Sequence, residues 1–272
     1  MSVSTDGTAA PANRFPEGTF APAPRAASLP SMLAAQTRME LTLLLRNGEQ
    51  LLLTMFIPIT LLIGLCLLPV DTGLGTSTAE RAAIFVPAIM TVAVMSTAFT
   101  GQAIAVGFDR RYGALKRLGA TPIPRWGIIA GKSAAVVIVV IMQSIIIGAI
   151  GAAFGWRPEP VGLLLGALIM LLGTVTFSAL GLLLGGTLKA EVVLALANLL
   201  WFAMVGVGSL VVLGTQRIPE SVHWVARIVP SGALTEALSQ ATRASVDGVG
   251  ICVLLVWAVV AGTLAVRWFR FE

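Results

Sequence analysis

The sequence is poor in charged residues, which account for only 11% of its 272 positions. Soluble domains carry about 25%, and a folded chain of this length needs a polar surface if it is to stay in water. Hydrophobic residues make up 57% of the chain, and there are 28 glycines in addition. These proportions exclude a soluble domain, and we expect a membrane protein.

Cysteine and histidine are almost absent. The two cysteines, Cys66 and Cys252, both lie inside apolar runs, which excludes a disulfide framework and a thiolate metal site. Because His223 is the single histidine, a metal centre would lack ligands. We therefore predict no metal site, no cofactor site and no catalytic residue in this chain.

The sequence offers no convincing nucleotide-binding motif either. The segment GIIAGKS, residues 127–133, has three residues between its first glycine and the Gly-Lys pair, where a phosphate-binding loop needs four. Its Lys132 is expected to anchor the end of a membrane helix, where the amine can extend toward water. The net charge of +5 is concentrated beside apolar runs, which favours a role in membrane topology over nucleic-acid binding.

Long apolar stretches dominate the rest of the chain. A membrane helix needs about 20 apolar residues. Six stretches predict an all-α, polytopic fold with spans at residues 51–69, 83–107, 127–153, 161–187, 192–213 and 248–266. Before them we expect a disordered, proline-rich tail, residues 1–30, and an interfacial amphipathic helix, residues 31–50. The transmembrane domain as a whole then comprises residues 31–272.

The distribution of lysine and arginine predicts the orientation of the chain. Six spans place both termini on one side, and that side carries thirteen of the 18 basic residues against five on the other. Because cytoplasmic segments are enriched in Lys and Arg, we expect both termini in the cytoplasm.

Two connecting segments have features beyond those of simple linkers. Residues 107–125 place five basic residues around three apolar ones, and we expect a short amphipathic helix there, with Asp109 as its N-cap and Gly119 at its end. The external residues 215–247 predict two amphipathic helical pieces, broken at Pro230, that dip into the outer leaflet. The predicted fold therefore includes an external helical hairpin between spans five and six.

Carboxylates are missing from the predicted spans. Ion-coupled transporters hold their ion with intramembrane Asp, Glu or His, so this absence disfavours a secondary transporter. If the protein drives transport, the energy enters from elsewhere. The basic helix after the second span is the evident docking point for a partner that supplies it.

Four segments make the chain similar to a known family. They are RMELTLLLRN before the first span, FDRRYGALKRLGATPIPRWGIIAGK after the second, IPESVHWVARIVPSGALTEAL between the last two, and the basic end RWFRFE. The second segment is similar to the family pattern R-R-x-G-x-L-x-x-L-x-x-T-P, and together the four cover nearly all of residues 31–272. The chain resembles the membrane subunit, or permease, of type-2 ABC exporters, a group that includes bacterial drug, lipid and polysaccharide exporters.

The resemblance implies a mechanism, partners and a location. In this family the helix after the second span is the coupling helix, which docks on a separate ATP-binding subunit that holds ATP and Mg. Two such subunits serve a pair of membrane subunits, a homodimer or heterodimer, in the bacterial cytoplasmic (inner) membrane. Here the coupling helix would comprise Asp109, Arg110, Arg111, Tyr112, Gly113, Leu115, Lys116, Arg117 and Leu118.

Within this expected coupling helix, the four basic side chains would supply polar contacts to the ATP-binding subunit. Tyr112, Leu115 and Leu118 would supply the apolar anchors. Many relatives carry an Arg-Glu or similar pair where this sequence has Arg111 followed by Tyr112.

The spans combine methionines with sparse polar groups, which suits a hydrophobic or amphipathic substrate such as a drug or a lipid-like molecule. The candidate pathway residues are Thr100, Gln102, Gln143, Thr176 and Asn198. The alternative function is a membrane scaffold or assembly protein that binds a partner or anionic lipid through its basic cytoplasmic loop.

Overall fold

The computed structural model describes residues 27–67, 75, 77–214 and 218–269. The predicted tail, residues 1–30, therefore lies outside the described residues except at its end. Helices account for nearly all of the described part, which contains no strand. The all-α prediction is confirmed.

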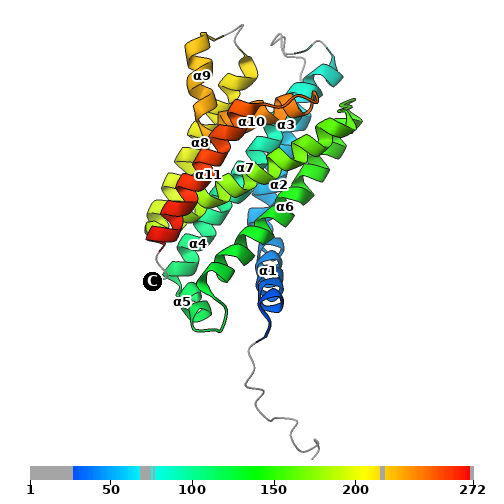
Figure 1. Ribbon diagram of the computed structural model, residues 1–272. Helices are drawn as coiled ribbons and strands as arrows, with labels where there is room; N and C mark the ends of the chain where they lie inside the picture. Colours follow the sequence, from blue (N-terminus) through cyan, green and yellow to red (C-terminus); the bar gives the residue numbers. More distant parts are fainter. Residues whose placement is uncertain (1–26, 68–74, 76, 215–217, 270–272) are drawn as a thin grey trace, which may run out of the picture.

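Six helical segments among the described residues are long and apolar enough to cross a membrane, as predicted. They form a bundle of tilted helices (Figure 1). In chain order they are α2 (Gly48–Leu67), the continuous α3 (Thr78–Val94), η1 (Met95–Gly101) and α4 (Gln102–Arg111), then α6 (Arg125–Ala153), α7 (Pro160–Thr187), α8 (Ala190–Leu213) and α11 (Gly248–Trp268).

The shorter helices gather at the two ends of this bundle (Figure 1). α1 (Leu29–Arg46) and α5 (Ala114–Gly119) lie at the end that also holds the last described residues. α9 (Glu220–Ile228) and α10 (Pro230–Ala241) lie at the opposite end. The entry of this helix pair into the outer leaflet stays a prediction, as does the position of α1 on the membrane surface.

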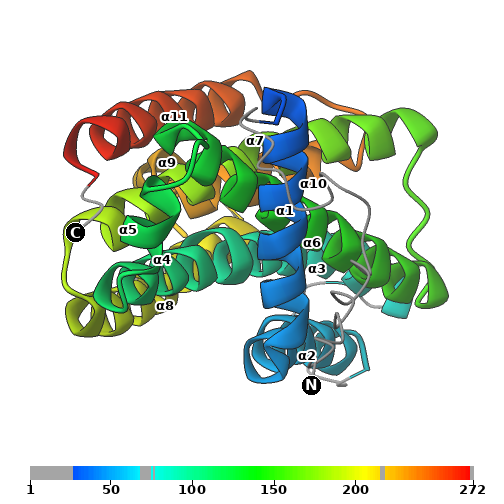
Figure 2. The same cartoon turned by 90° about the horizontal axis from the view of Figure 1, so that it is seen from below.

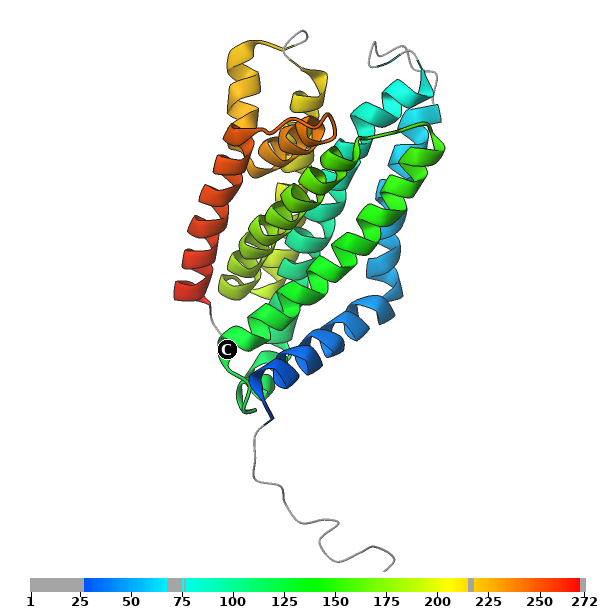
Figure 3. The same cartoon turned by 45° about the vertical axis from the view of Figure 1, so that its right-hand side comes forward.

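α1 turns away from α2 and crosses one end of the bundle, where it packs along α6 (Figures 2 and 3). The change of direction occurs at Asn47, whose side chain forms a cap for α2. Its Oδ1 accepts a hydrogen bond from the Gln50 backbone N–H at 3.2 Å, and its Nδ2 donates to Gln50 Oε1 at 3.2 Å. An Asn placed three residues before a Gln is a recognisable helix start, so the expected helix 31–50 is divided here into α1 and the first turn of α2.

The second span, α3 to α4, is the most buried of the six and forms the centre of the bundle. Its middle turn, η1, is π-helical, which means that one extra residue is accommodated within the helix. Glycines of α7 allow α7 to lie close to the second span. A Cβ at Gly181 would lie 2.8 Å from the carbonyl oxygen of Phe99, and one at Gly185 would collide with the backbone of Ala103.

α10 is almost entirely buried within the chain, although the sequence predicts an amphipathic helix there that dips into the outer leaflet. Its side chains join the main apolar core, in which Leu234 and Leu238 pack with Phe177 of α7 and Leu254 of α11. α10 contacts α3, α7, α8 and α11. It therefore fills the space between spans at one end of the bundle.

Candidate functional site

The segment expected to be the coupling helix is built from two helices. α4 continues the second span without a break to Arg111, so Asp109 lies in the last turn of a long helix. The prediction that Asp109 caps a new helix is wrong, because the apolar span simply extends past it. The break comes at Gly113, which has a left-handed backbone with φ of 68°, a conformation that favours glycine. The short α5 then ends at Gly119, as predicted.

α5 presents one face to the outside and one to the bundle. Lys116 and Arg117 are exposed, whereas Leu115 is only 1% exposed; Tyr112, which ends α4 just before α5, is 67% exposed. Leu115 packs with Val106 and Ile128 in a small apolar cluster, and Leu118 covers that cluster. Leu115 therefore holds α5 on its own chain, and the expected role of this residue as an anchor for another subunit does not fit its burial.

The two arginines at the end of α4 also bind within the chain. Arg110 Nη1 donates to the carbonyl oxygens of Gly185 at 3.0 Å and Leu188 at 2.9 Å, which lie at the C-terminal end of α7, where a cation is favoured. Arg111 forms an ion pair with Glu191 in the first turn of α8. Both arginines thus fix α4 against the connection between α7 and α8, and the outward face consists of Tyr112, Lys116 and Arg117.

Lys132 lies at the centre of an ion-pair network that the sequence did not predict. Its Nζ is 2.8 Å from Glu40 Oε2 and 2.6 Å from Asp109 Oδ2. The Lys132 and Glu40 side chains are each 8% exposed, and Gln36 Nε2 donates to Glu40 Oε1 at 2.8 Å. The expectation that Lys132 extends toward water is therefore wrong, because two carboxylates from α1 and α4 reach its amine first.

This Lys132 network joins three segments that are distant in the sequence. Removal of one member of a buried ion pair leaves an uncompensated charge, at a cost of about 3–5 kcal/mol. The close approach of α1 to α6 depends on Gly131, since a Cβ there would lie 2.5 Å from the Gln36 side chain. α4 and α1 are consequently connected to the long helix α6 through charged contacts, and Gly131 lets α1 lie close to it.

Three of the five predicted pathway residues are buried and bonded inside the bundle. Gln143 accepts from Thr97 Oγ1 at 3.0 Å and donates to the Thr54 carbonyl oxygen at 3.0 Å. Gln102 Oε1 accepts from Ser178 Oγ at 2.7 Å. Thr176 donates to the backbone of Leu172 on its own helix and of Leu254 on α11. These polar groups link neighbouring spans.

The other two, Thr100 and Asn198, line a pocket of about 470 Å³ between α2, η1, α4 and α8. Gln50 and Trp201 are also in its wall, and the Trp201 indole N–H donates to Ser96 Oγ at 3.1 Å. Gln50 is not among the residues predicted from the sequence to line a pathway, because residues 31–50 are expected to form an interfacial helix. The cap motif at Asn47 is the signal that could have placed Gln50 on the first span.

The fold and these contacts define a polytopic helical membrane protein with an exposed cationic helix at one end. A family model described as ABC-2 family transporter protein matches residues 70–267, which include spans two to six. The chain therefore belongs to the ABC-2 transporter family. This family comprises the membrane permeases of ABC transporters and implies a membrane-embedded complex with an ATP-binding partner. A comparison with curated proteins finds no significant match.

Proposed function

We propose that this permease is the membrane-spanning half of an ATP-driven exporter, and that α5 is its coupling helix. The observation that carries the proposal is an exposed group of three side chains, Lys116 and Arg117 on α5 and Tyr112 at the end of α4, beside a helix face that is fixed to the bundle through Leu115. An aromatic side chain flanked by cations is a typical hot-spot composition for binding a partner. ATP and Mg bind in that partner subunit, and hydrolysis takes place there.

Movement of α5 would reach the membrane part through direct contacts. Gly113 joins α5 directly to α4 and thus to the central second span. The Lys132 network carries the same displacement to α1 and α6. Closure of two ATP-binding subunits would in this way shift the second span in each membrane subunit and change access to a pathway between them.

The pathway wall in this proposal is the face that contains Thr100 and Asn198. α2 and α8, which flank the pocket there, are the least buried spans of the chain. A second copy of this chain, or a similar subunit, would cover this face and complete the pathway. Because the pocket mixes Trp201 and Phe202 with a few amides and hydroxyls, it suits a hydrophobic or amphipathic substrate, drug or lipid-like.

The orientation follows from the location of the basic residues. α1, α5 and the last described residues lie at one end, together with the adjoining ends of α4, α6, α7 and α8 (Figure 1). This end holds ten of the fourteen lysines and arginines that the structure describes. The positive-inside rule places that end in the cytoplasm, where ATP is available. We propose the bacterial cytoplasmic membrane as the location.

The test is a pull-down of the tagged chain from mild-detergent membranes, with partner stoichiometry and ATP hydrolysis measured on the eluate. We expect an ATPase to co-elute at one copy per membrane subunit. In a triple variant with Tyr112→Ala, Lys116→Glu and Arg117→Glu, the amount of co-eluting ATPase should fall by about tenfold or more. Arg243→Glu, an exposed cation at the opposite end, is the matched control and should retain the partner.

A clean eluate without ATPase from membranes that contain it would contradict the exporter. The scaffold alternative has support in the same exposed cations, which also suit a non-ATPase partner or anionic lipid. It predicts that the charge-reversed chain loses only a salt-dependent association, while ATP hydrolysis is absent from every eluate.

A further inference from the structure

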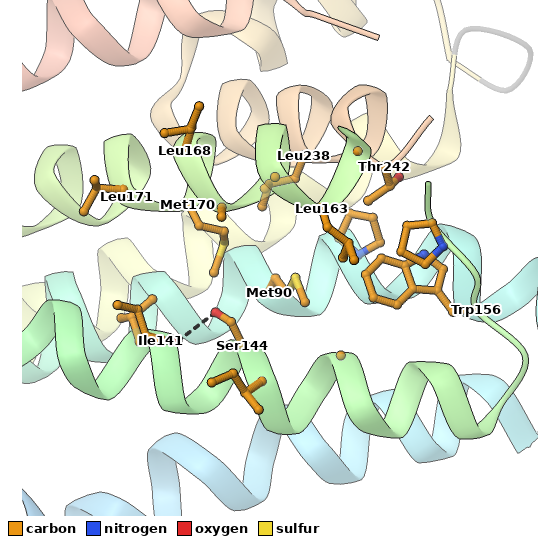
Figure 4. Close-up of a pocket in the computed structure, with 18 of the residues that line it drawn as sticks. Met90, Ile141, Ser144, Trp156, Leu163, Leu168, Met170, Leu171, Leu238 and Thr242 are labelled. Carbon is orange, nitrogen blue, oxygen red and sulfur yellow. Dashed lines mark hydrogen bonds between the residues drawn. The ribbon is translucent and has the colours of Figure 1, made fainter. Parts of the chain in front are cut away.

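A second and larger cavity lies on another side of the molecule. It has a volume of about 960 Å³ and runs between α6 and α7, with α3 and α10 behind it. Figure 4 shows its walls, which include Met90, Met170, Leu163 and Leu238. Around it, Ile145 and Leu168 are exposed on the surfaces of α6 and α7. Since these are membrane helices, the groove opens toward the hydrocarbon of the bilayer.

The three hydroxyl groups in the groove offer no hydrogen-bond donor to a ligand. Ser144 donates to the Val140 carbonyl oxygen at 2.7 Å, Thr174 to that of Met170 at 2.7 Å, and Thr242 to that of Ser239 at 2.8 Å. Each hydroxyl proton is thus used within its own segment. An occupant of the middle of the groove needs no polar group there, and a hydrocarbon chain meets that condition.

One end of the groove, unlike its apolar middle, offers hydrogen-bond donors and a positive charge. Trp156 and Arg157 line it, at the connection from α6 to α7, and Arg157 is exposed. The two hydrogen bonds from Arg157 to the carbonyl oxygens of Ala152 and Trp156 both use Nη1, so other N–H groups of the guanidinium remain for an anionic oxygen. Tryptophan and arginine are side chains typical of the headgroup level of a membrane.

We propose that the groove between α6 and α7 binds one anionic phospholipid, with an acyl chain between the two helices and the phosphate at Arg157. The groove is complementary to such a lipid in two ways. Its wall is mostly apolar, and a cation, Arg157, lies at one end. The groove is separate from the pocket of Thr100 and Asn198, because the two share no lining residue. The lipid site therefore does not depend on the exporter proposal and can be tested without an ATPase.

Gly166 offers a direct way to block the groove. It lines the cavity, and a Cβ built on it meets no atom within 4 Å, so Gly166→Trp places a large side chain in the space for the acyl chain. Gly262 of α11 is equally unobstructed and lies outside the cavity, which makes Gly262→Trp the matched control.

The experiment uses the full chain in nanodiscs of mixed phosphatidylglycerol and phosphatidylethanolamine, with retained lipids counted by native mass spectrometry after transfer to mild detergent. We expect one retained phosphatidylglycerol per wild-type chain, a decrease of about tenfold in Gly166→Trp, and no change in Gly262→Trp. Equal retention in the two tryptophan variants would overturn the proposal. So would Gly166→Cys crosslinks between two copies, because they would show that a protein covers the groove.

Substitutions of Arg157 provide a second test, which does not fill the groove and which applies if Gly166→Trp fails to fold. Arg157→Gln is expected to lower the preference for phosphatidylglycerol over phosphatidylethanolamine by about fivefold, and Arg157→Lys to restore it. A preference unchanged in Arg157→Gln, or one that the lysine fails to restore, would overturn the assignment of the headgroup to this residue.

Discussion

The two ends of the bundle are held together by different interactions. At the α5 end, Lys132 joins α6 to α1 and α4 through Glu40 and Asp109. At the α10 end, a helix is buried among apolar side chains such as Leu238. An ion pair, Arg227 with Asp247 at 2.5 Å, adds to that packing.

The ion-paired end and the apolar end differ in how readily their contacts can change. Lys132 has two carboxylate partners, so either one can be released while the amine keeps the other. A closely packed apolar side chain cannot exchange partners in this way. If it shifts, it leaves an unfilled cavity. The charged end thus has the character of a connection that can rearrange, and the apolar end that of a fixed support.

The largest expected effect comes from Lys132→Met. Both carboxylates would be left without their cation in a mostly buried site, and the free energy of unfolding should fall by about 4 kcal/mol. The measurement is thermal unfolding in detergent, with exposed Lys189→Met as the control. Adding Glu40→Gln and Asp109→Asn to Lys132→Met should recover most of the loss, and a triple variant as unstable as the single one would contradict the ion-pair explanation.

A somewhat smaller effect is expected from Leu238→Ala at the opposite end. The side chain is 1% exposed, so its truncation should cost about 3 kcal/mol through lost contacts and a cavity. Because the α5 face is far from this residue, the folded variant should still capture the ATPase in a pull-down. Loss of capture at a temperature where the variant is folded would show that the two ends are coupled.

The smallest effects separate two amides that look equivalent in the sequence. Gln143→Ala breaks bonds to Thr97 and Thr54 and should lower the free energy of unfolding by about 1–2 kcal/mol. Asn198→Ala, on an exposed surface, should change it by less than about 0.5 kcal/mol. In a transport assay with the ATPase present, we expect only Asn198→Ala to alter substrate preference, and an unaltered profile would remove Asn198 from the pathway.

Much of the architecture is readable along the chain because it depends on local properties. The length and apolarity of each stretch identify the six spans, and Gly119 marks the end of α5. Local signals also produced errors. Asp109 has the residue type of a helix cap and follows an apolar run, yet the helix continues through it to Arg111, and its carboxylate pairs with Lys132.

In the candidate site, too, some features are predicted by the sequence and others are set by packing. That a cationic segment follows the second span is evident from the sequence, whereas the faces of α5 are set by how it packs. Arg110 and Arg111 have the same charge as Lys116 and Arg117, but the first pair lies at the end of α4, within reach of α7 and α8. No periodicity within so short a segment distinguishes them, since their partners are about 75–80 residues away.

Hydropathy and charge act residue by residue, so the sequence alone predicts an all-helical membrane protein with a basic loop after its second span. The burial of Lys132 between Glu40 and Asp109 and the position of α10 in the core follow only from how the helices pack. The same packing makes Gln143 join two spans and leaves Asn198 facing a pocket. The physical reason is that a polar side chain in a membrane helix bonds to whichever partner the packing of helices brings within reach, and that partner is set by the whole bundle.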